Sequence, residues 1–160
     1  MKSILNESSL TEYNLHKKIY NCIRLHFVFC AKYRRKIFQM EGAKEVFQEA
    51  LIKECEKKSI TILRFECQDE WVHIYIECPP DISPKNIMTD IKRGTSSALK
   101  QQILNKDKHA TVWTADGIIA DSTSFSTKNI VDFLFDQKKR SGKTEREELS
   151  HFAERVADAL

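Results

Sequence analysis

The sequence lacks the features of secreted, zinc-binding and membrane-spanning proteins. Its five cysteines are odd in number and form no C-x-x-C pair, which argues against a disulfide framework or a zinc knuckle. No apolar run approaches the roughly 20 residues that a membrane span needs, and the first residues carry no charged-then-apolar signal. Free thiols suit a reducing compartment. We therefore expect a cytoplasmic protein with no membrane partner.

What the chain does contain is an alternating order of strand and helix patterns within the length of one domain. Apolar residues recur with period 2 in the strand candidates and at helical spacing in the helix candidates. These candidates are residues 23–31 (strand), 42–58 (helix), 60–67 and 71–78 (strands), 84–103 (helix), 118–120 (strand) and a last helix with Phe133 and Gln137. This split βαβ order predicts an α+β, ferredoxin-like sandwich, with an antiparallel sheet and helices packed on one face.

The two ends of the chain differ from this core domain, which we place at residues 20–140. Residues 1–19 are polar and have no strong apolar period, so we expect them to be an N-terminal extension. Residues 141–160 begin at a Ser-Gly break and then carry apolar residues at spacings of four. That spacing predicts a C-terminal tail helix with a narrow apolar stripe.

The strongest turn signal in the chain is the pair Asp116-Gly117. It lies between short strand candidates at residues 111–113 and 118–120. An Asp-Gly pair between two strands is typical of a tight turn, because such turns need positive φ values that aspartate tolerates and glycine adopts freely. We therefore predict a turn between two strands at this point.

The most informative pattern lies on the strand at residues 71–78. Side chains alternate between the faces of a strand, so Trp71, His73 and Tyr75 share one face. A His-hydrophobe-His triplet at the start of this strand would direct two imidazoles at one divalent ion. Here Trp71 stands in place of the first histidine, so the pattern is that of a damaged metal site.

Several segments, taken in order, carry a resemblance to a known family. Residues 26–36 look like the family's first strand and the basic residues that follow it. Residues 84–97 look like its next helix, and Trp113 falls at the position of a tryptophan in the family. Residues 130–137 are similar to its nucleophile helix, in which a tyrosine sits four residues before a metal-binding glutamine. With the strand 71–78, these segments resemble the single-tyrosine HUH transposases of small bacterial insertion sequences, relatives of the REP-associated tyrosine transposases.

The resemblance implies a chemistry and two departures from it. In the family, a tyrosine phenolate attacks the phosphorus of single-stranded DNA, while a metal ion held by two histidines and the glutamine polarises the phosphate. Here His73 and Gln137 are kept as a remnant metal site, Trp71 replaces a histidine and Phe133 replaces the tyrosine. Phenylalanine has no attacking oxygen, and indole has no lone pair for a metal. We therefore expect impaired or lost cleavage with no cofactor required, whereas an active form would need Mg2+ or Mn2+.

The same residues leave other interpretations open. Tyr75 lies on the same strand face and is a substitute nucleophile in an active, divergent enzyme. Glu70 or Glu77 is a substitute oxygen ligand for magnesium or manganese. Trp71 is also a platform on which an unpaired base stacks. The simplest interpretation of Phe133 is core packing, and that of the strand face is a polar-aromatic surface covered by a helix.

Basic residues gather at the ends of several predicted elements. Lys32, Arg34 and Arg35 follow the first strand, and Lys92 and Arg93 lie on the central helix. Such groups track a phosphate backbone, although charged residues make up 31% of the chain and a solvated surface is the simpler interpretation. The resemblance implies single-stranded or hairpin DNA as the partner, with RNA left open. It also implies a homodimer, in which the nucleophile helix of one subunit completes the site of the other.

Three functions are compatible with these patterns. The first is a transposase-like protein that binds single-stranded or hairpin DNA, with impaired or lost cleavage and strand transfer. The second is an active, divergent, metal-dependent transposase, and the third is a regulatory or protein-interaction module on the same dimeric scaffold. Salt dependence separates the first from the third, because binding through several phosphates weakens steeply as salt rises. A covalent adduct with DNA identifies the second.

Overall fold

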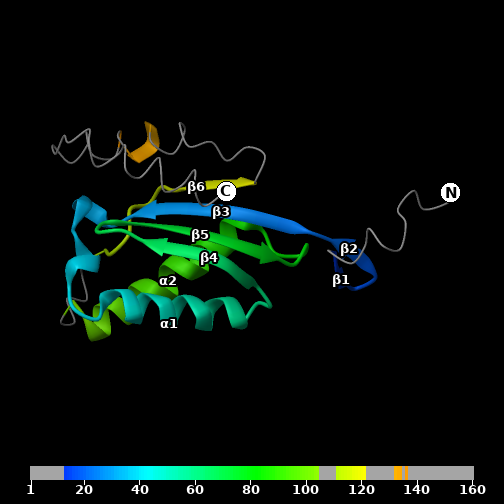
Figure 1. Ribbon diagram of the computed structural model, residues 1–160, viewed down its shortest axis with the longest axis horizontal. Helices are drawn as coiled ribbons and strands as arrows, with labels where there is room; N and C mark the ends of the chain where they lie inside the picture. The colour runs from blue at the N-terminus through cyan, green and yellow to red at the C-terminus, as the bar shows by residue number, and fades with distance from the viewer. Residues whose placement is uncertain (1–12, 105–110, 122–131, 135, 137–160) are drawn as a thin grey trace.

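The computed structural model describes residues 13–104, 111–121, 132–134 and 136. Within them, four strands form one antiparallel sheet in the order β4-β5-β3-β6. The strands are β3 (Ile23–Cys30), β4 (Thr61–Cys67), β5 (Trp71–Cys78) and β6 (Ile118–Asp121). The helices that cover one face of this sheet are α1 (Ala43–Glu56) and α2 (Pro84–Gln102) (Figure 1). The predicted α+β sandwich with a split βαβ order is confirmed.

Both helices begin at residues suited to a helix start. Ser83 precedes α2, and its Oγ accepts a hydrogen bond from the backbone nitrogen of Asn86 at 3.1 Å. Pro84 occupies the first helical position, where no intrahelical N–H is needed. Gly42 precedes α1 with a φ of 77°, in the left-handed region that glycine adopts without strain. Each helix therefore starts within one residue of the position that the sequence predicts.

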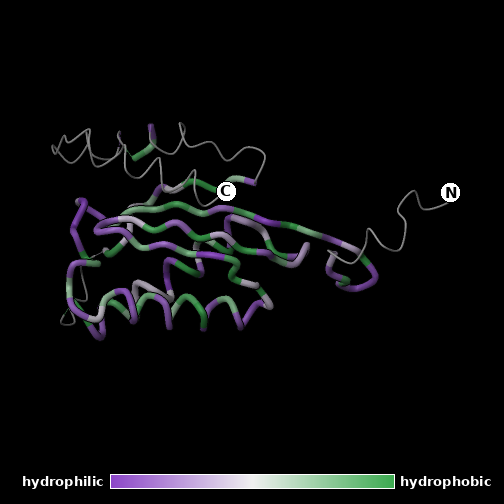
Figure 2. Tube along the Cα trace, in the orientation of Figure 1, coloured by the Kyte–Doolittle hydropathy of each residue, from purple (hydrophilic) through white to green (hydrophobic). Residues whose placement is uncertain are grey.

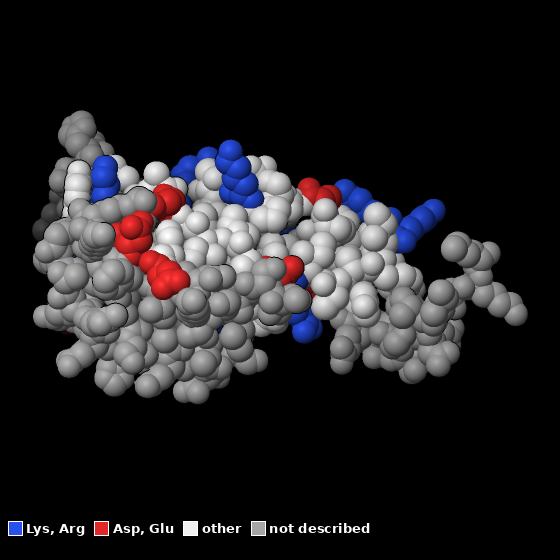
Figure 3. All heavy atoms as spheres, turned by 90° about the horizontal axis from the view of Figure 1, so that it is seen from above, with Lys and Arg blue, Asp and Glu red and all other residues white. Residues whose placement is uncertain are grey.

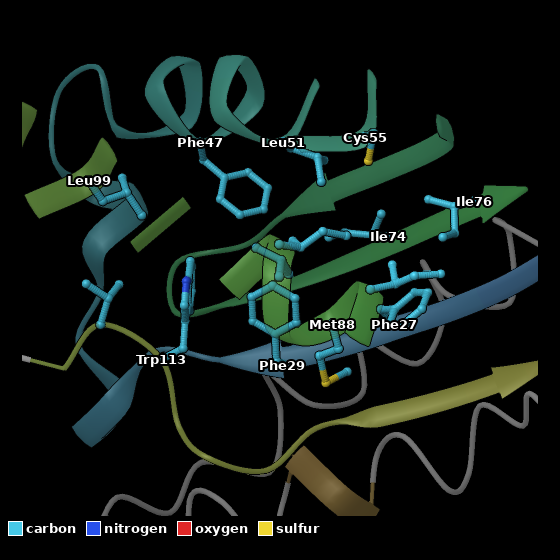
Figure 4. Packing of buried hydrophobic residues seen from close by; sticks show 14 of the residues in the cluster. Phe27, Phe29, Phe47, Leu51, Cys55, Ile74, Ile76, Met88, Leu99 and Trp113 are labelled. Carbon is cyan, nitrogen blue, oxygen red and sulfur yellow. The ribbon is translucent and has the colours of Figure 1, made fainter. Parts of the chain in front are cut away.

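The main hydrophobic core lies between the two helices and the sheet face that they cover. Phe27 and Phe29 of β3 and Ile74 of β5 are fully buried there, together with Phe47 and Leu51 of α1 (Figure 4). Burial of each such side chain contributes about 2 kcal/mol to folding. Figure 2 shows hydrophobic stretches along the strands and alternating hydropathy along α1. The apolar periods of strand and helix thus account for this half of the molecule.

The chain between α2 and β6 differs from the predicted turn. Trp113 forms an isolated antiparallel bridge with Ala31, and β6 then continues antiparallel along the same neighbour, β3. The strand predicted at 111–113 is thus reduced to one bridge, and the chain does not reverse at the Asp-Gly pair. A Cβ on Gly117 would lie 3.0 Å from the carbonyl oxygen of Val28. The glycine permits a close passage over β3 instead of closing a hairpin.

A small second sheet precedes the main one. The strands β1 (Asn14–His16) and β2 (Ile19–Asn21) form an antiparallel hairpin across a turn at Lys17, whose φ is positive. Lys17 Nζ donates a hydrogen bond to the carboxylate of Asp81 at 2.9 Å, which ties the hairpin to the chain beyond β5. The hairpin extends past the end of the main sheet (Figure 1). It also spans the boundary, between residues 19 and 20, at which we expected the extension to meet the core domain.

The remaining expectations concern thiols, membranes and the C-terminal end. All five cysteines are free thiols, and burial raises the pKa of Cys30, Cys55 and Cys67 to about 12. In the part of the chain that the structure describes, no helix is long and apolar enough to cross a membrane. The tail helix predicted at 141–160 lies outside the described residues.

Candidate functional site

The sheet face opposite the two helices carries the candidate site. The register of β3 and β5 sets His26 opposite Tyr75 and Cys30 opposite Trp71. Directly opposed residues of an antiparallel pair share a face, and alternation along β5 adds His73 to the same face. Two adjacent strands therefore bring two imidazoles, a phenol and an indole together, on the side of the sheet away from the main core.

Two buried histidines form the polar centre of this face. His26 Nδ1 and His73 Nε2 lie 2.9 Å apart, within hydrogen-bond distance, and the two rings stack with centroids 5.2 Å apart. Burial lowers the pKa of His26 to about 4. Burial, followed by the charges of His26 and Arg64, lowers the pKa of His73 to about 3. Both imidazoles are therefore neutral at neutral pH, and one ring nitrogen donates to the other.

His26, the partner of His73, was not among the predicted site residues. The two residues are 47 positions apart, and their contact follows from the register of β3 against β5. A histidine among apolar residues in the first strand was the available signal. Only the strand register, which apolar alternation does not define across two distant strands, brings the two rings together.

Trp71 lies in the interior of the protein. Its side chain is 6% exposed and belongs to a small apolar cluster with Val28, Cys30 and Leu134. The interpretation of Trp71 as a platform for an unpaired base is therefore wrong, because a base cannot reach a ring that neighbouring side chains cover. Where a first metal-binding histidine was expected in an intact site, this chain has a core residue.

Phe133 belongs to the same apolar region as Trp71. The short helical segment at residues 132–134 lies on the side of the sheet away from α1 and α2 (Figure 1). Leu134 is fully buried in the small cluster, and Phe133 is half-buried and packs against it. The structure thus brings Trp71 and Phe133, the two predicted departures from the family pattern, into one hydrophobic region. Gln137, the predicted remnant ligand, lies outside the described residues.

The alternative nucleophile and ligands have other partners. The ring of Tyr75 is half-buried and stacks on His26, with centroids 4.1 Å apart and planes 9° apart. Glu70 accepts a hydrogen bond from Arg34 Nη2 at 2.9 Å inside the protein. Glu77 lies further along β5 and forms an ion pair with Arg24 at 2.8 Å. Hydrogen bonds from Asn14 and then Arg24 lower the pKa of the Glu77 carboxyl. Both carboxylates are thus committed to basic partners.

The described residues offer few ligands for a metal ion on this sheet face. Among them, no group of three or more His, Cys, Asp or Glu side chains is placed to hold an ion. His26 and His73 offer imidazoles, but Trp71 offers only an N–H donor, which does not coordinate a cation. A catalytic divalent ion needs several protein ligands in a defined geometry. Within the described residues, this face therefore offers two imidazoles that are hydrogen-bonded to each other, beside apolar packing.

Two of the predicted DNA contacts are engaged inside the protein. Arg34 is 5% exposed, and besides its ion pair with Glu70 its Nη1 donates to the Cys30 sulfur at 3.4 Å. Lys92 Nζ donates to the backbone carbonyls of Thr114 and Asp116 at 2.9 and 2.8 Å. Burial lowers the pKa of Lys92. Neither positive charge is presented to a ligand in this arrangement, because both hold neighbouring segments in place.

The other three basic candidates lie nearer the surface. Arg93 is exposed and pairs with Asp90 one helical turn away. Lys32 and Arg35 are half-buried in the segment that follows β3, and Arg35 Nη2 donates to the carbonyl of Thr111 at 2.8 Å. On the face shown in Figure 3, lysine and arginine side chains form separate groups with acidic side chains between some of them. The basic residues are thus distributed over several sites on this face.

Comparison with known sequences gives a family match over most of the chain. The family model described as "Transposase IS200 like" matches residues 18–137. The transposases for insertion sequence element IS200 of Salmonella typhimurium strain LT2 and of Salmonella typhi are each 32% identical to this chain over 118 residues. The matched part covers 72% of this chain and 76% of each relative.

Comparison with solved structures gives the same arrangement of elements. A Deinococcus radiodurans protein assigned as a transposase has a TM-score of 0.70 at 12% identity, over 78% of this chain and 97% of its own. A REP-associated tyrosine transposase bound to a REP hairpin has a TM-score of 0.51 at 15% identity, over 82% of this chain and 76% of its own. At such low identities the likeness concerns the fold alone.

Proposed function

Because the chain belongs to the IS200-like transposase family, we propose that it binds single-stranded or hairpin DNA and has lost cleavage and strand transfer. The observation that carries this proposal is apolar packing at the two positions where the family's chemistry needs a ligand and a nucleophile. Trp71 is buried with Leu134, and Phe133 packs against the same cluster. Hydrocarbon has no oxygen that could attack a phosphate, and an indole N–H has no lone pair that could coordinate a metal ion.

Hairpin DNA is the ligand class with the most support. One neighbour in fold is a REP-associated tyrosine transposase bound to a REP hairpin. Lys32, Arg35 and Arg93 lie nearer the surface and are the proposed phosphate contacts. Arg34 and Lys92 are proposed to act indirectly, since their buried charges hold the segments beside Lys32 and Arg93. Binding of this kind depends on counterion release and falls as salt rises.

The proposal includes a homodimer located in the cytoplasm. The family resemblance implies the dimer, and the free thiols of all five cysteines suit a reducing compartment. Light scattering of the purified chain checks the oligomeric state. A mass equal to one chain at micromolar concentration would remove the dimer from the proposal and leave DNA binding in place.

The function is tested by separating binding from covalent attachment. The purified protein is mixed with Mn2+ and a labelled panel of single-stranded hairpin DNAs, and the products are run on native and denaturing gels. We expect a shifted complex that weakens steeply with salt, and no adduct that survives denaturant. Absence of a shift at low salt would contradict the proposal and favour the protein-interaction module.

A divergent enzyme is the second candidate, because Tyr75 lies beside two imidazoles. Under this alternative a covalent adduct forms and disappears in Tyr75→Phe, since the phenol oxygen is the only atom removed. The matched control is Tyr20→Phe, at an exposed tyrosine of the protein's β1–β2 hairpin. An adduct that Tyr75→Phe abolishes and Tyr20→Phe preserves would replace the proposed function by this one.

A further inference from the structure

The turn after β3 holds an exposed tyrosine in a strained backbone conformation. Residues Lys32–Arg34 form one 3-10 turn in which Tyr33 has φ 60° and ψ 21°. This left-handed region is sterically unfavourable for residues with a Cβ, and it is rarely adopted by bulky ones. Among the described residues, Tyr33 is the only aromatic residue with a positive φ. Its side chain is 76% exposed, so burial does not compensate for the strain.

The surrounding structure fixes this conformation from several sides. Arg34, which also has a positive φ of 54°, is buried and paired with Glu70 at 2.9 Å. The backbone nitrogen of Lys32 donates to the carbonyl of Val112 at 2.8 Å, and that of Ala31 donates to the carbonyl of Glu70 at 2.7 Å. Strained residues persist only where neighbouring contacts determine them, and they cluster at functional sites. The buried Arg34 thus holds the adjacent side chain outward.

The fold itself does not need a tyrosine at this position. Glycine adopts the left-handed region without a steric penalty and would close the same turn. The hydrogen bonds that fix the turn come from backbone atoms and from the Arg34 side chain, and none of these involves the phenol ring of Tyr33. A reason for the ring must therefore be sought outside the folded chain.

The ring is accompanied by positive charge. Lys32 Nζ lies 5.2 Å from the centroid of the Tyr33 ring, at cation–π distance. Arg35 follows, with its guanidinium held near the surface by the carbonyl of Thr111. An exposed aromatic ring with neighbouring cations is the arrangement by which proteins bind single-stranded nucleic acid, with bases on the rings and phosphates on the cations.

We propose that Tyr33 is a stacking site for an unpaired base of the bound DNA, and that Lys32 binds the adjoining phosphate. The inference rests on the proposed DNA binding and names the residue that recognises unpaired nucleotides. The contacts that hold the turn fix the backbone of Tyr33 with its side chain directed outward before DNA arrives, so little backbone freedom is lost on binding. Recognition by stacking is tolerant of base identity but requires a base to be present.

The test compares substitutions of Tyr33 with abasic substitutions in the DNA. Fluorescence anisotropy gives the Kd of the full-length protein for a hairpin whose unpaired nucleotides are replaced one at a time by abasic residues. For Tyr33→Gly we expect a Kd increased roughly 10-fold and a thermal midpoint raised by about 2–4 °C, because strain is relieved. Tyr33→Phe keeps the ring and should keep the affinity. The matched control, Tyr20→Ala, removes an exposed ring from the protein's β1–β2 hairpin and should leave the Kd unchanged.

The decisive result is whether the effect of an abasic residue on the Kd disappears when Tyr33 is also replaced. One abasic position should weaken binding of the unchanged protein roughly 10-fold and have no further effect in Tyr33→Gly. If the protein binds hairpin DNA and Tyr33→Gly binds it equally well, the stacking proposal is overturned while DNA binding stands. If the unchanged protein binds no hairpin at low salt, the proposed function fails and the stacking site fails with it. A preference for the same hairpin in RNA would transfer the site to RNA and overturn the assignment to DNA.

Discussion

The two faces of the main sheet are built from the same strands but differ in side-chain chemistry. On the helix-covered face, β3 and β5 contribute apolar residues such as Phe29 and Ile74, which the helices bury completely. On the other face the same strands contribute His26, His73 and Trp71. One face therefore supplies most of the apolar burial, whereas the other buries polar groups whose desolvation is unfavourable unless they are hydrogen-bonded.

Under the proposed function, this difference explains how cleavage can be lost without loss of the fold. The resemblance aligns Trp71 and Phe133 with polar groups of the family pattern, and both lie in or against a small cluster distinct from the main core. Their substitution leaves the packing of Phe29 and Ile74 against the helices untouched. The sheet thus separates the residues that hold the domain together from those that determine its chemistry.

The largest expected effect lies on the helix-covered face. Phe29→Ala removes a fully buried ring that packs edge-on against Trp113, with centroids 4.9 Å apart. We expect a loss of about 4 kcal/mol in the free energy of unfolding, because transfer and cavity terms add. Urea denaturation followed by circular dichroism measures it. The control Leu63→Ala, at an exposed position of β4, should change stability by less than about 0.5 kcal/mol. Equal effects of the two substitutions would remove the contrast between core and surface.

A smaller effect is expected where a buried ion pair contacts the other face. Arg34→Met leaves the Glu70 carboxylate buried without its cation and should cost about 3 kcal/mol. Arg93→Met, at an exposed pair with Asp90, is the control and should cost less than about 1 kcal/mol. The double variant Arg34→Met with Glu70→Gln should recover part of the loss, since no unpaired charge remains. If the double variant is no more stable than Arg34→Met, the buried charge is not the cause.

The histidine pair makes the stability of the polar face dependent on pH. The pKa values of His26 and His73, about 4 and about 3, lie below the ordinary value of 6.5. Between pH 6.5 and these values the unfolded chain binds protons that the folded chain does not, so stability falls as the pH is lowered through this window. Between pH 7 and pH 5, we expect the free energy of unfolding to fall by about 2 kcal/mol less in His73→Gln than in the unchanged protein. Urea denaturation at each pH tests this, with His16→Gln, at a half-buried histidine outside this sheet face, as control. An unaltered pH slope in His73→Gln would show that this histidine is solvated.

The fold could be predicted from the sequence to a much greater extent than the site. The strand Trp71–Cys78 and the start of α2 at Pro84 follow from apolar alternation and a Ser-Pro start, which are local signals. The sequence also shows which residues carry a positive charge, but it does not show whether each charged side chain points into the protein or out to solvent. Arg34 and Lys92 were predicted as DNA contacts and turn inward, because their partners come from distant segments.

The contacts that define the site depend on register between distant strands. His26 meets His73 only because β3 and β5 pair with one particular offset, and a shift by one residue would put His26 on the opposite face. The Asp-Gly pair predicted a turn, yet competition from the open edge of β3 extends the chain past Gly117 instead. Local propensity was overridden at this point by tertiary pairing.

The smallest expected change concerns Phe133 and separates the proposed loss of the nucleophile from the proposed loss of the metal ligand. Phe133→Tyr adds one hydroxyl to a half-buried ring, so the free energy of unfolding should change by less than about 1 kcal/mol. Under the proposed function the variant regains an attacking oxygen, but Trp71 still stands where the resemblance places a metal ligand. We therefore expect no covalent adduct with hairpin DNA in Mn2+ on denaturing gels, and the same result for Trp71→His alone. An adduct in Phe133→Tyr alone would mean that the metal site functions despite Trp71, and loss of the nucleophile would then be the single cause of inactivity.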